Sequence, residues 1–157
     1  MSRPIKKRTV QEPPKIQGMK PIGVPVSFLD KVILSIDEYE AIRLADYEGL
    51  EHQKAAEIMN ISRPTFTRLI EKARGKLAES IVAVKELIIE GGSFSFISDL
   101  IRCLDCGKIS RFEDPNYIPE TCPHCKSANI VHLNQWFSGG RGHGRGGRGF
   151  RGGRGGW

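Results

Sequence analysis

Four cysteines form two pairs with the spacing that tetrahedral metal sites use. Two residues separate Cys103 from Cys106 and Cys122 from Cys125, and fifteen residues separate the two pairs. Thiolates at this spacing are typical of a four-cysteine zinc site, so we expect one zinc ion held by all four sulfur atoms. A complete shell of four thiolates leaves no position for water, which predicts a structural ion and not a catalytic one.

Iron is the alternative metal, because rubredoxin-like sites use the same pairs of cysteines. A disulfide is disfavoured, since the N-terminus lacks the apolar segment of a secretory signal and we expect a reducing, cytoplasmic location. His124 lies inside the second pair and is not expected to be a ligand, because the thiolates complete the shell. With β-forming runs at 108–112 and 129–133, the segment 93–137 resembles a zinc ribbon.

The C-terminal segment, residues 138–157, repeats Arg-Gly and Arg-Gly-Gly around two aromatic residues. It has no apolar periodicity, so we expect it to be disordered. It resembles an RGG box, in which arginine binds phosphate and stacks on bases. We expect it to bind RNA or single strands with little sequence preference; the alternative is a tail that only solvates the chain. The arginines concerned are Arg141, Arg145, Arg148, Arg151 and Arg154.

Charge is distributed unevenly along the 157 residues. Residues 1–20 carry six Lys or Arg against one Glu, and the tail carries five Arg and no acid, whereas residues 21–137 hold 13 basic and 17 acidic residues. Cationic ends favour polyanions, so nucleic acid is the expected partner. Neither end has an amphipathic apolar stripe and no apolar stretch is long enough to span a bilayer, so we expect no membrane partner.

Residues 35 to about 90 have the pattern of consecutive helices. Ser35 and Glu38 form an S-x-x-E capping box, which predicts a first helix that ends near residue 47. A second helix is predicted at about 52–59. The apolar run 81–89 is expected to extend the third helix, described next, or to follow it as another. Before the first helix, β-forming runs at 22–26 and 32–34 predict short strands.

A turn at Asn60 and Ile61 leads to the third helix, for which Ser62 is a favourable N-cap. Its apolar stripe begins at Phe66, which is therefore expected in the core. Two helices joined in this way have the helix-turn-helix layout, in which the second helix enters the major groove of DNA. The alternative is a three-helix core that binds a protein. The predicted DNA contacts on the third helix are Ser62, Arg63, Pro64, Thr65, Thr67, Arg68 and Lys72, with Arg63, Thr67 and Arg68 foremost.

The N-terminal segment, residues 1–20, is expected to be a basic arm. Arg3, Lys6, Lys7 and Arg8 precede the predicted folded part, as in basic arms that lie along a DNA groove. We expect these residues to bind DNA and to position the protein on it without choosing the sequence.

The residues quoted above resemble known families. The run from Ala56 to Phe66 resembles region four of sigma factors and the related response regulators. Arg3-Pro4 with Arg8-x-Val10, the segment Asp37–Asp46 and the segment Ser62–Phe66 together resemble domain of unknown function 134, also called uncharacterised protein family 0251. The resemblance covers about residues 2–92 and implies a predicted DNA-binding protein with a sigma-region-four-like helix-turn-helix. Glu51 and His52 depart from the family's usual Ser or Thr cap of the second helix.

These observations predict a mainly α fold: a winged or sigma-region-four-like helix-turn-helix domain (21–92), a small β zinc ribbon (93–137) and disordered termini (1–20 and 138–157). The expected function is sequence-specific binding of double-stranded DNA in transcriptional regulation. The alternative is an RNA-binding or ribonucleoprotein-associated factor that uses the ribbon and the tail. We expect no enzyme, because the four His form no acid–base or metal pattern and there is no phosphate loop. The sequence leaves the target, the effector and homo-oligomer formation open.

Overall fold

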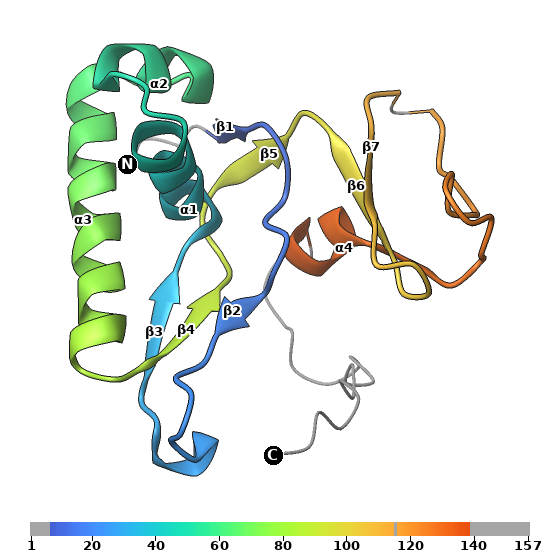
Figure 1. Ribbon diagram of the computed structural model, residues 1–157. Helices are drawn as coiled ribbons and strands as arrows, with labels where there is room; N and C mark the ends of the chain where they lie inside the picture. The colour runs from blue at the N-terminus through green and yellow to red at the C-terminus, as the bar shows by residue number, and fades with distance from the viewer. Residues whose placement is uncertain (1–6, 115, 139–157) are drawn as a thin grey trace, which may run out of the picture.

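The computed structural model describes residues 7–114 and 116–138. Helices α1, α2 and α3 lie along one side of the molecule, beside the sheet of β2, β3 and β4 (Figure 1). Strands β6 and β7 lie at the other side, and α4 lies between the two parts (Figure 1). Within the described residues the strands are β1 (Arg8–Val10), β2 (Gly18–Met19), β3 (Lys31–Leu34), β4 (Glu86–Ile89), β5 (Phe94–Phe96), β6 (Asp99–Cys103), β7 (Ile109–Phe112) and β8 (Ile130–His132). The helices are α1 (Ile36–Ile42), α2 (His52–Met59), α3 (Arg63–Val82) and α4 (Leu133–Ser138), with a 3-10 turn η1 (Val26–Phe28) and a π-helical turn η2 (Arg43–Tyr47).

The described strands form three small sheets, so the expected mainly α class holds only in part. The sheet order is β2-β4-β3 beside the helices, β7-β6-β8 at the cysteines, and a separate pair β1-β5. Strands β3 and β4 are parallel, and the chain between them is the block of helices from α1 to α3. Parallel neighbours need such a crossover connection, which explains why the helices interrupt the sheet in sequence.

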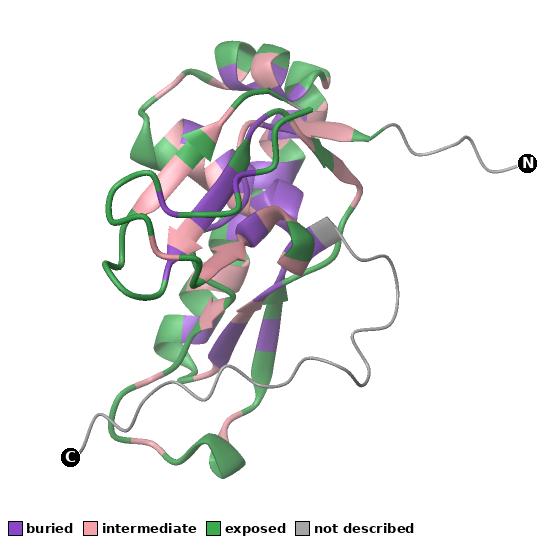
Figure 2. Ribbon diagram, turned by 90° about the vertical axis from the view of Figure 1, so that its right-hand side faces the viewer, coloured by how far each residue is buried: buried purple, intermediate pink, exposed green. Residues whose placement is uncertain are grey.

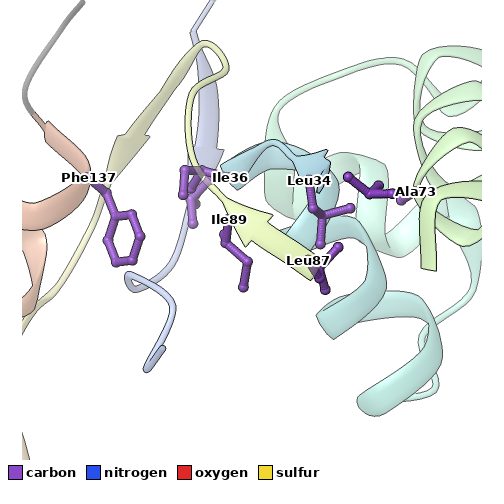
Figure 3. Packing of buried hydrophobic residues seen from close by; sticks show 8 residues of the cluster. Leu34, Ile36, Ala73, Leu87, Ile89 and Phe137 are labelled. Carbon is purple, nitrogen blue, oxygen red and sulfur yellow. The ribbon is translucent and has the colours of Figure 1, made fainter. Parts of the chain in front are cut away.

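The main core lies between this sheet and the helices. Leu34 of β3 and Leu87 and Ile89 of β4 are buried against Ala73 of α3 (Figure 3). Phe137 of α4 enters the same cluster from the opposite side (Figure 3). The boundary expected between residues 92 and 93 is therefore crossed by apolar packing. In Figure 2 the buried residues gather in the interior, while the turn at the lower end is exposed.

The N-terminal segment is folded from Arg8 onward. Strand β1 pairs in parallel with β5, with Arg8 opposite Phe94 and Val10 opposite Phe96, and Val10 is completely buried. Strand β2 pairs with β4, where Gly18 lies so close to Leu87 that a Cβ atom would collide with its carbonyl oxygen. The basic arm expected at 1–20 thus differs from the structure over its described part; Arg3 and Lys6 lie outside the described residues.

The predicted starts of two helices are confirmed. At α1, Ser35 Oγ accepts a hydrogen bond from the Glu38 amide and the Glu38 side chain accepts one from the Ser35 amide, which is the predicted capping box. At α3, Ser62 Oγ accepts from the Thr65 amide. Asn60 ends α2 in the left-handed conformation, at φ 57°, where asparagine is better tolerated than most residues.

Three acidic side chains in α1 are buried with basic partners from elsewhere in the chain. Asp37 accepts a hydrogen bond from Arg8 of β1. Glu38 Oε2 lies 2.8 Å from Lys76 Nζ of α3. Glu40 is bound by Arg43 of η2, which also donates to Gln11. Because buried carboxylates are tolerated only when paired, these contacts fix α1 against β1 and α3.

The apolar run 81–89 was wrongly predicted to be helical. Helix α3 ends at Val82, Val84 has a φ of 54°, and residues 86–89 form β4. A short apolar run suits a buried strand as well as a helix, and here it lies in the middle of a sheet. The strand expected at 22–26 is also absent, since these described residues form a loop that leads into η1.

Candidate metal centre and helix surface

The four cysteines come together at one end of the sheet β7-β6-β8. Cys103 is the last residue of β6, and the loops on either side of β7 and β8 bring in Cys106, Cys122 and Cys125. All four sulfur atoms lie within 4.8 Å of one another, with 3.5 Å from Cys103 Sγ to Cys125 Sγ and 3.7 Å from Cys106 Sγ to Cys122 Sγ. A disulfide needs about 2.0 Å, so these are free thiols in a cluster that could hold a metal ion.

The two cysteine pairs have the same backbone geometry. In the first, the Gly107 amide donates to the Cys103 carbonyl; in the second, the Lys126 amide donates to the Cys122 carbonyl. The residue after each pair is left-handed, Gly107 at φ 74° and Lys126 at φ 62°. Each loop thus turns sharply enough for both of its sulfur atoms to face the same point.

Amide groups that point at the sulfur atoms favour the thiolate form. The amides of Cys125 and His124 donate to Cys122 Sγ and lower the pKa of that thiol to about 7, against the opposing effect of burial. A second amide, that of Cys106, lies 3.4 Å from Cys103 Sγ. The site therefore favours at least one thiolate before any metal binds. His124 is exposed and lies outside the group of ligands, as expected.

Asp105 connects the two cysteine loops, and sequence reasoning missed it. Its carboxylate accepts hydrogen bonds from the Ser127 hydroxyl and from Asn129 Nδ2, the latter at 3.1 Å. These bonds, that from Ser127 first, lower the pKa of Asp105. No sequence signal could have identified this role, because the partners follow more than twenty residues later.

The structure places the predicted DNA-contact residues of α3 in two different environments. Arg63, Pro64, Arg68 and Lys72 are exposed. The three hydroxyl groups have partners inside the protein: Ser62 Oγ and Thr65 Oγ1 are 2.7 Å apart, and Thr67 Oγ1 lies 3.0 Å from His52 Nδ1. Phe66 is completely buried, as predicted.

The remaining predicted contacts divide in the same way. Lys7 is exposed at the start of the described residues. Arg8 instead donates to Asp37 and is held in β1. The tail arginines, from Arg141 to Arg154, lie outside the described residues. Sequence reasoning took Arg8 for a DNA contact because its partner Asp37 is 29 residues away in the chain.

The chain was then compared with known proteins. A model of the family described as "Protein of unknown function DUF134" matches residues 1–97. The chain belongs to this family. The DUF134 match ends before β6, so the four cysteines lie beyond it.

Curated relatives carry the corresponding family name. A UPF0251 protein of Chloroherpeton thalassium is 52% identical over 145 residues, covering 92% of this chain and 95% of the relative. A UPF0251 protein of Moorella thermoacetica is 40% identical over 146 residues, covering 93% and 91%. No solved structure matches the chain. Among the described residues, no helix has the length and apolarity needed to cross a membrane.

Proposed function

We propose that the protein binds double-stranded DNA through α2, the turn at Asn60 and Ile61, and α3, used as a helix-turn-helix. The observation that carries this proposal concerns the arginines. Of the seven in the described residues, Arg8, Arg43, Arg74, Arg102 and Arg111 bind a carboxylate or a carbonyl of the protein itself. Arg63 and Arg68 alone in this part of the chain have no such partner, and both lie on the exposed start of α3.

The polarity of α3 supports the same surface. Phe66, Leu69, Ile70 and Ala73 are buried against α1 and α2, which leaves the side with Arg68 facing solvent. The N-terminal end of a 20-residue helix also carries a partial positive charge, and its free amides favour a phosphate. We infer that this end approaches the DNA and that Arg68, one turn further along, reaches base edges.

Lys72 adds a weaker contribution to this surface. Its Nζ lies 3.9 Å from Glu38 Oε1, yet 69% of its side chain is exposed. Glu38 has a closer partner in Lys76, so Lys72 is free to turn toward a phosphate. Because Thr65 and Thr67 already have internal partners, the proposed contacts are Arg63, Arg68 and Lys72. Regulation of transcription is the role that a sequence-specific surface of this kind would serve.

The test is selection of duplex sequences by the full-length protein, followed by affinity measurements at one salt concentration. Arg68→Ala should cost about 1–3 kcal/mol at the preferred site and relax specificity there. Arg74→Ala is the matched control, because Arg74 lies on the same helix but is held by Asp46, and it should leave affinity unchanged. Equal affinity for all duplexes, or no loss in Arg68→Ala, would refute the proposal. Recovery of transcripts from cells in place of duplex sites would support the RNA-binding alternative.

We also propose that the cysteine cluster holds one structural zinc ion. A tetrahedron with zinc–sulfur bonds of about 2.3 Å has sulfur–sulfur edges of about 3.8 Å, and the two sulfur pairs are at 3.5 and 3.7 Å. Elemental analysis of protein purified under reducing conditions should find one zinc per chain. Iron in its place would refute the assignment. The absence of enzymatic activity stays a prediction.

A further inference from the structure

One end of the molecule exposes a concentration of large apolar side chains. They lie on β2 with the loop that follows it and on the end of α3: Met19 (62% exposed), Ile22 (101%), Phe28 (80%), Ile81 (76%), Val82 (82%) and Val84 (46%). We call these six residues the apolar end. The Glu86 amide donates to the Asp30 carbonyl, which joins the two segments. Both lie at the lower end of the molecule in Figure 1.

Val84 makes this surface notable in a second way. It is a β-branched residue with a φ of 54°, in a conformation that glycine or asparagine adopts without strain. Strain retained at an exposed turn points to a use for the side chain outside the folding of the single chain. The apolar side chain of Val84 continues the surface formed by Ile81 and Val82 of α3.

The exposed area suits a stable interface. The six side chains expose on the order of 900 Å², more than the largest patch on a typical monomer and close to the roughly 800 Å² that each partner buries in a standard interface. Asp30 and Lys31, exposed at the edge of the apolar end, make no ion pair within the described residues. Opposite charges side by side suit a two-fold axis, across which each faces its complement.

We propose that the apolar end is the interface of a homodimer, covered by the same surface of a second copy of this chain. The Arg-Gly tail cannot supply the cover, because Phe150 and Trp157 are its only large apolar residues. A nucleic acid would meet no basic cluster here. The interface lies at the end of α3 opposite Arg63, so it leaves the proposed DNA surface free in both copies. This proposal does not depend on the one for DNA.

Sedimentation velocity of the full-length protein, freed of nucleic acid at high salt and run at 1 and 100 µM, tests the proposal. At 100 µM the wild type should sediment at twice the chain mass of 17.5 kDa. The double variant Phe28→Asp with Ile81→Asp should raise the dissociation constant at least tenfold, with an unchanged circular-dichroism spectrum. Ile97→Asp is the matched control, since Ile97 is 62% exposed but lies outside the apolar end, and it should dimerise like the wild type.

Two results would overturn the proposal. A wild type that stays monomeric at 100 µM would exclude the dimer, and its flotation with anionic lipid vesicles would then assign the apolar end to a membrane surface. A dimer that persists in the double variant would place the interface elsewhere. In either case the Arg68→Ala experiment still judges DNA binding, because a monomer retains the complete α3 surface.

Discussion

The fully buried carboxylate of Glu40 is bound by the guanidinium of Arg43 through two hydrogen bonds, 2.8 Å from Nε to Oε2 and 2.7 Å from Nη2 to Oε1. This fork places the charge of Arg43 where water is excluded, and the hydrogen bond to Glu40 raises the pKa of Arg43. Gln11, just after β1, also accepts from Arg43. The pair therefore joins the N-terminal segment to the helices.

Removing Arg43 should be strongly destabilising. Arg43→Ala leaves the Glu40 carboxylate buried without its cation, which should cost about 3–5 kcal/mol of unfolding free energy. Urea unfolding of the variant, followed by circular dichroism, measures the loss. A loss below about 1 kcal/mol would show that water reaches Glu40 and that the pair is not buried in solution.

Arg74→Ala is the control for this experiment. Arg74 binds Asp46 on the surface, and such exposed pairs contribute at most about 1 kcal/mol. The hydrogen bond from Arg74 lowers the pKa of Asp46 below 3.8. The small stabilisation is therefore present at neutral pH and is lost as the pH falls through the lowered pKa. In Arg74→Ala, an NMR titration should find the pKa of Asp46 raised toward 3.8.

Gly92→Ala should destabilise the fold more than Gly91→Ala does. Both glycines are left-handed, at φ 98° and 74°, so either substitution introduces strain of about 1–2 kcal/mol. A Cβ on Gly92 would also stand 2.6 Å from Asp37 Oδ1, whereas a Cβ on Gly91 meets nothing within 4 Å. Gly92→Ala must therefore displace the carboxylate that binds Arg8. Equal losses in thermal unfolding would contradict this account of Asp37.

Relieving the strain at Val84 should stabilise the single chain. Val84→Gly removes about 1–2 kcal/mol of left-handed strain and adds about 0.4–1 kcal/mol of entropy to the unfolded chain, for a net gain of roughly 0.5–1 kcal/mol. The neighbouring Ala83→Gly is the control, because Ala83 has a φ of −87° and should lose stability instead. Unfolding is best compared at a concentration at which the protein is monomeric. A loss in both variants would show that Val84 is unstrained.

Metal removal should unfold the cysteine loops and spare the helices. Strand β5 is paired with β1 and Phe137 lies in the main core, so the part that depends on the ion is narrower than residues 93–137, at about 103–132. Hydrogen exchange after chelation should rise in this part, while α1 to α3 stay protected. Asp105→Ala should weaken metal binding without changing the four ligands. Protection that survives chelation throughout would show that the metal is not structural.

The tail should set affinity without setting sequence choice. A chain that ends at Ser138 lacks five arginines, so its binding to single strands should lose a salt dependence of about −0.7 per phosphate contact. Its ranking of duplex sequences should stay that of the full chain, because α3 is intact. Titrations of a matched duplex, a mismatched duplex and a single strand at two salt concentrations measure both effects. A changed ranking would give the tail a part in specificity.

Local patterns predicted the parts of the fold that local hydrogen bonds determine. The caps at Ser35 and Ser62 and the cysteine loops each depend on partners within a few residues, so spacing alone identified them. The pairing of β1 with β5 was not predictable in this way. Neither strand has more than three residues, and the register is set by contacts formed across the whole helical block.

The acidic residues of α1 show the same limit. Asp37, Glu38 and Glu40 read as a solvated first turn, because charged residues there usually face water and favour the helix dipole. Their partners Arg8 and Lys76 are 29 and 38 residues away in the chain. The same blindness made Arg8 look like a DNA contact, whereas Arg63 and Arg68, which have no distant partner in the described residues, kept the surface position expected of them.

The register of β1 against β5 also has a consequence for synthesis. Arg8 leaves the ribosome early, yet its strand partner Phe94 is made only after the chain has passed through all three helices. At about 5–20 residues per second this interval is on the order of 5–20 s. During that time Val10 has no strand to pair with and Asp37 lacks its arginine. Closing so long a loop is slow, so docking of the N-terminal strand is expected to be a late step of folding on the ribosome.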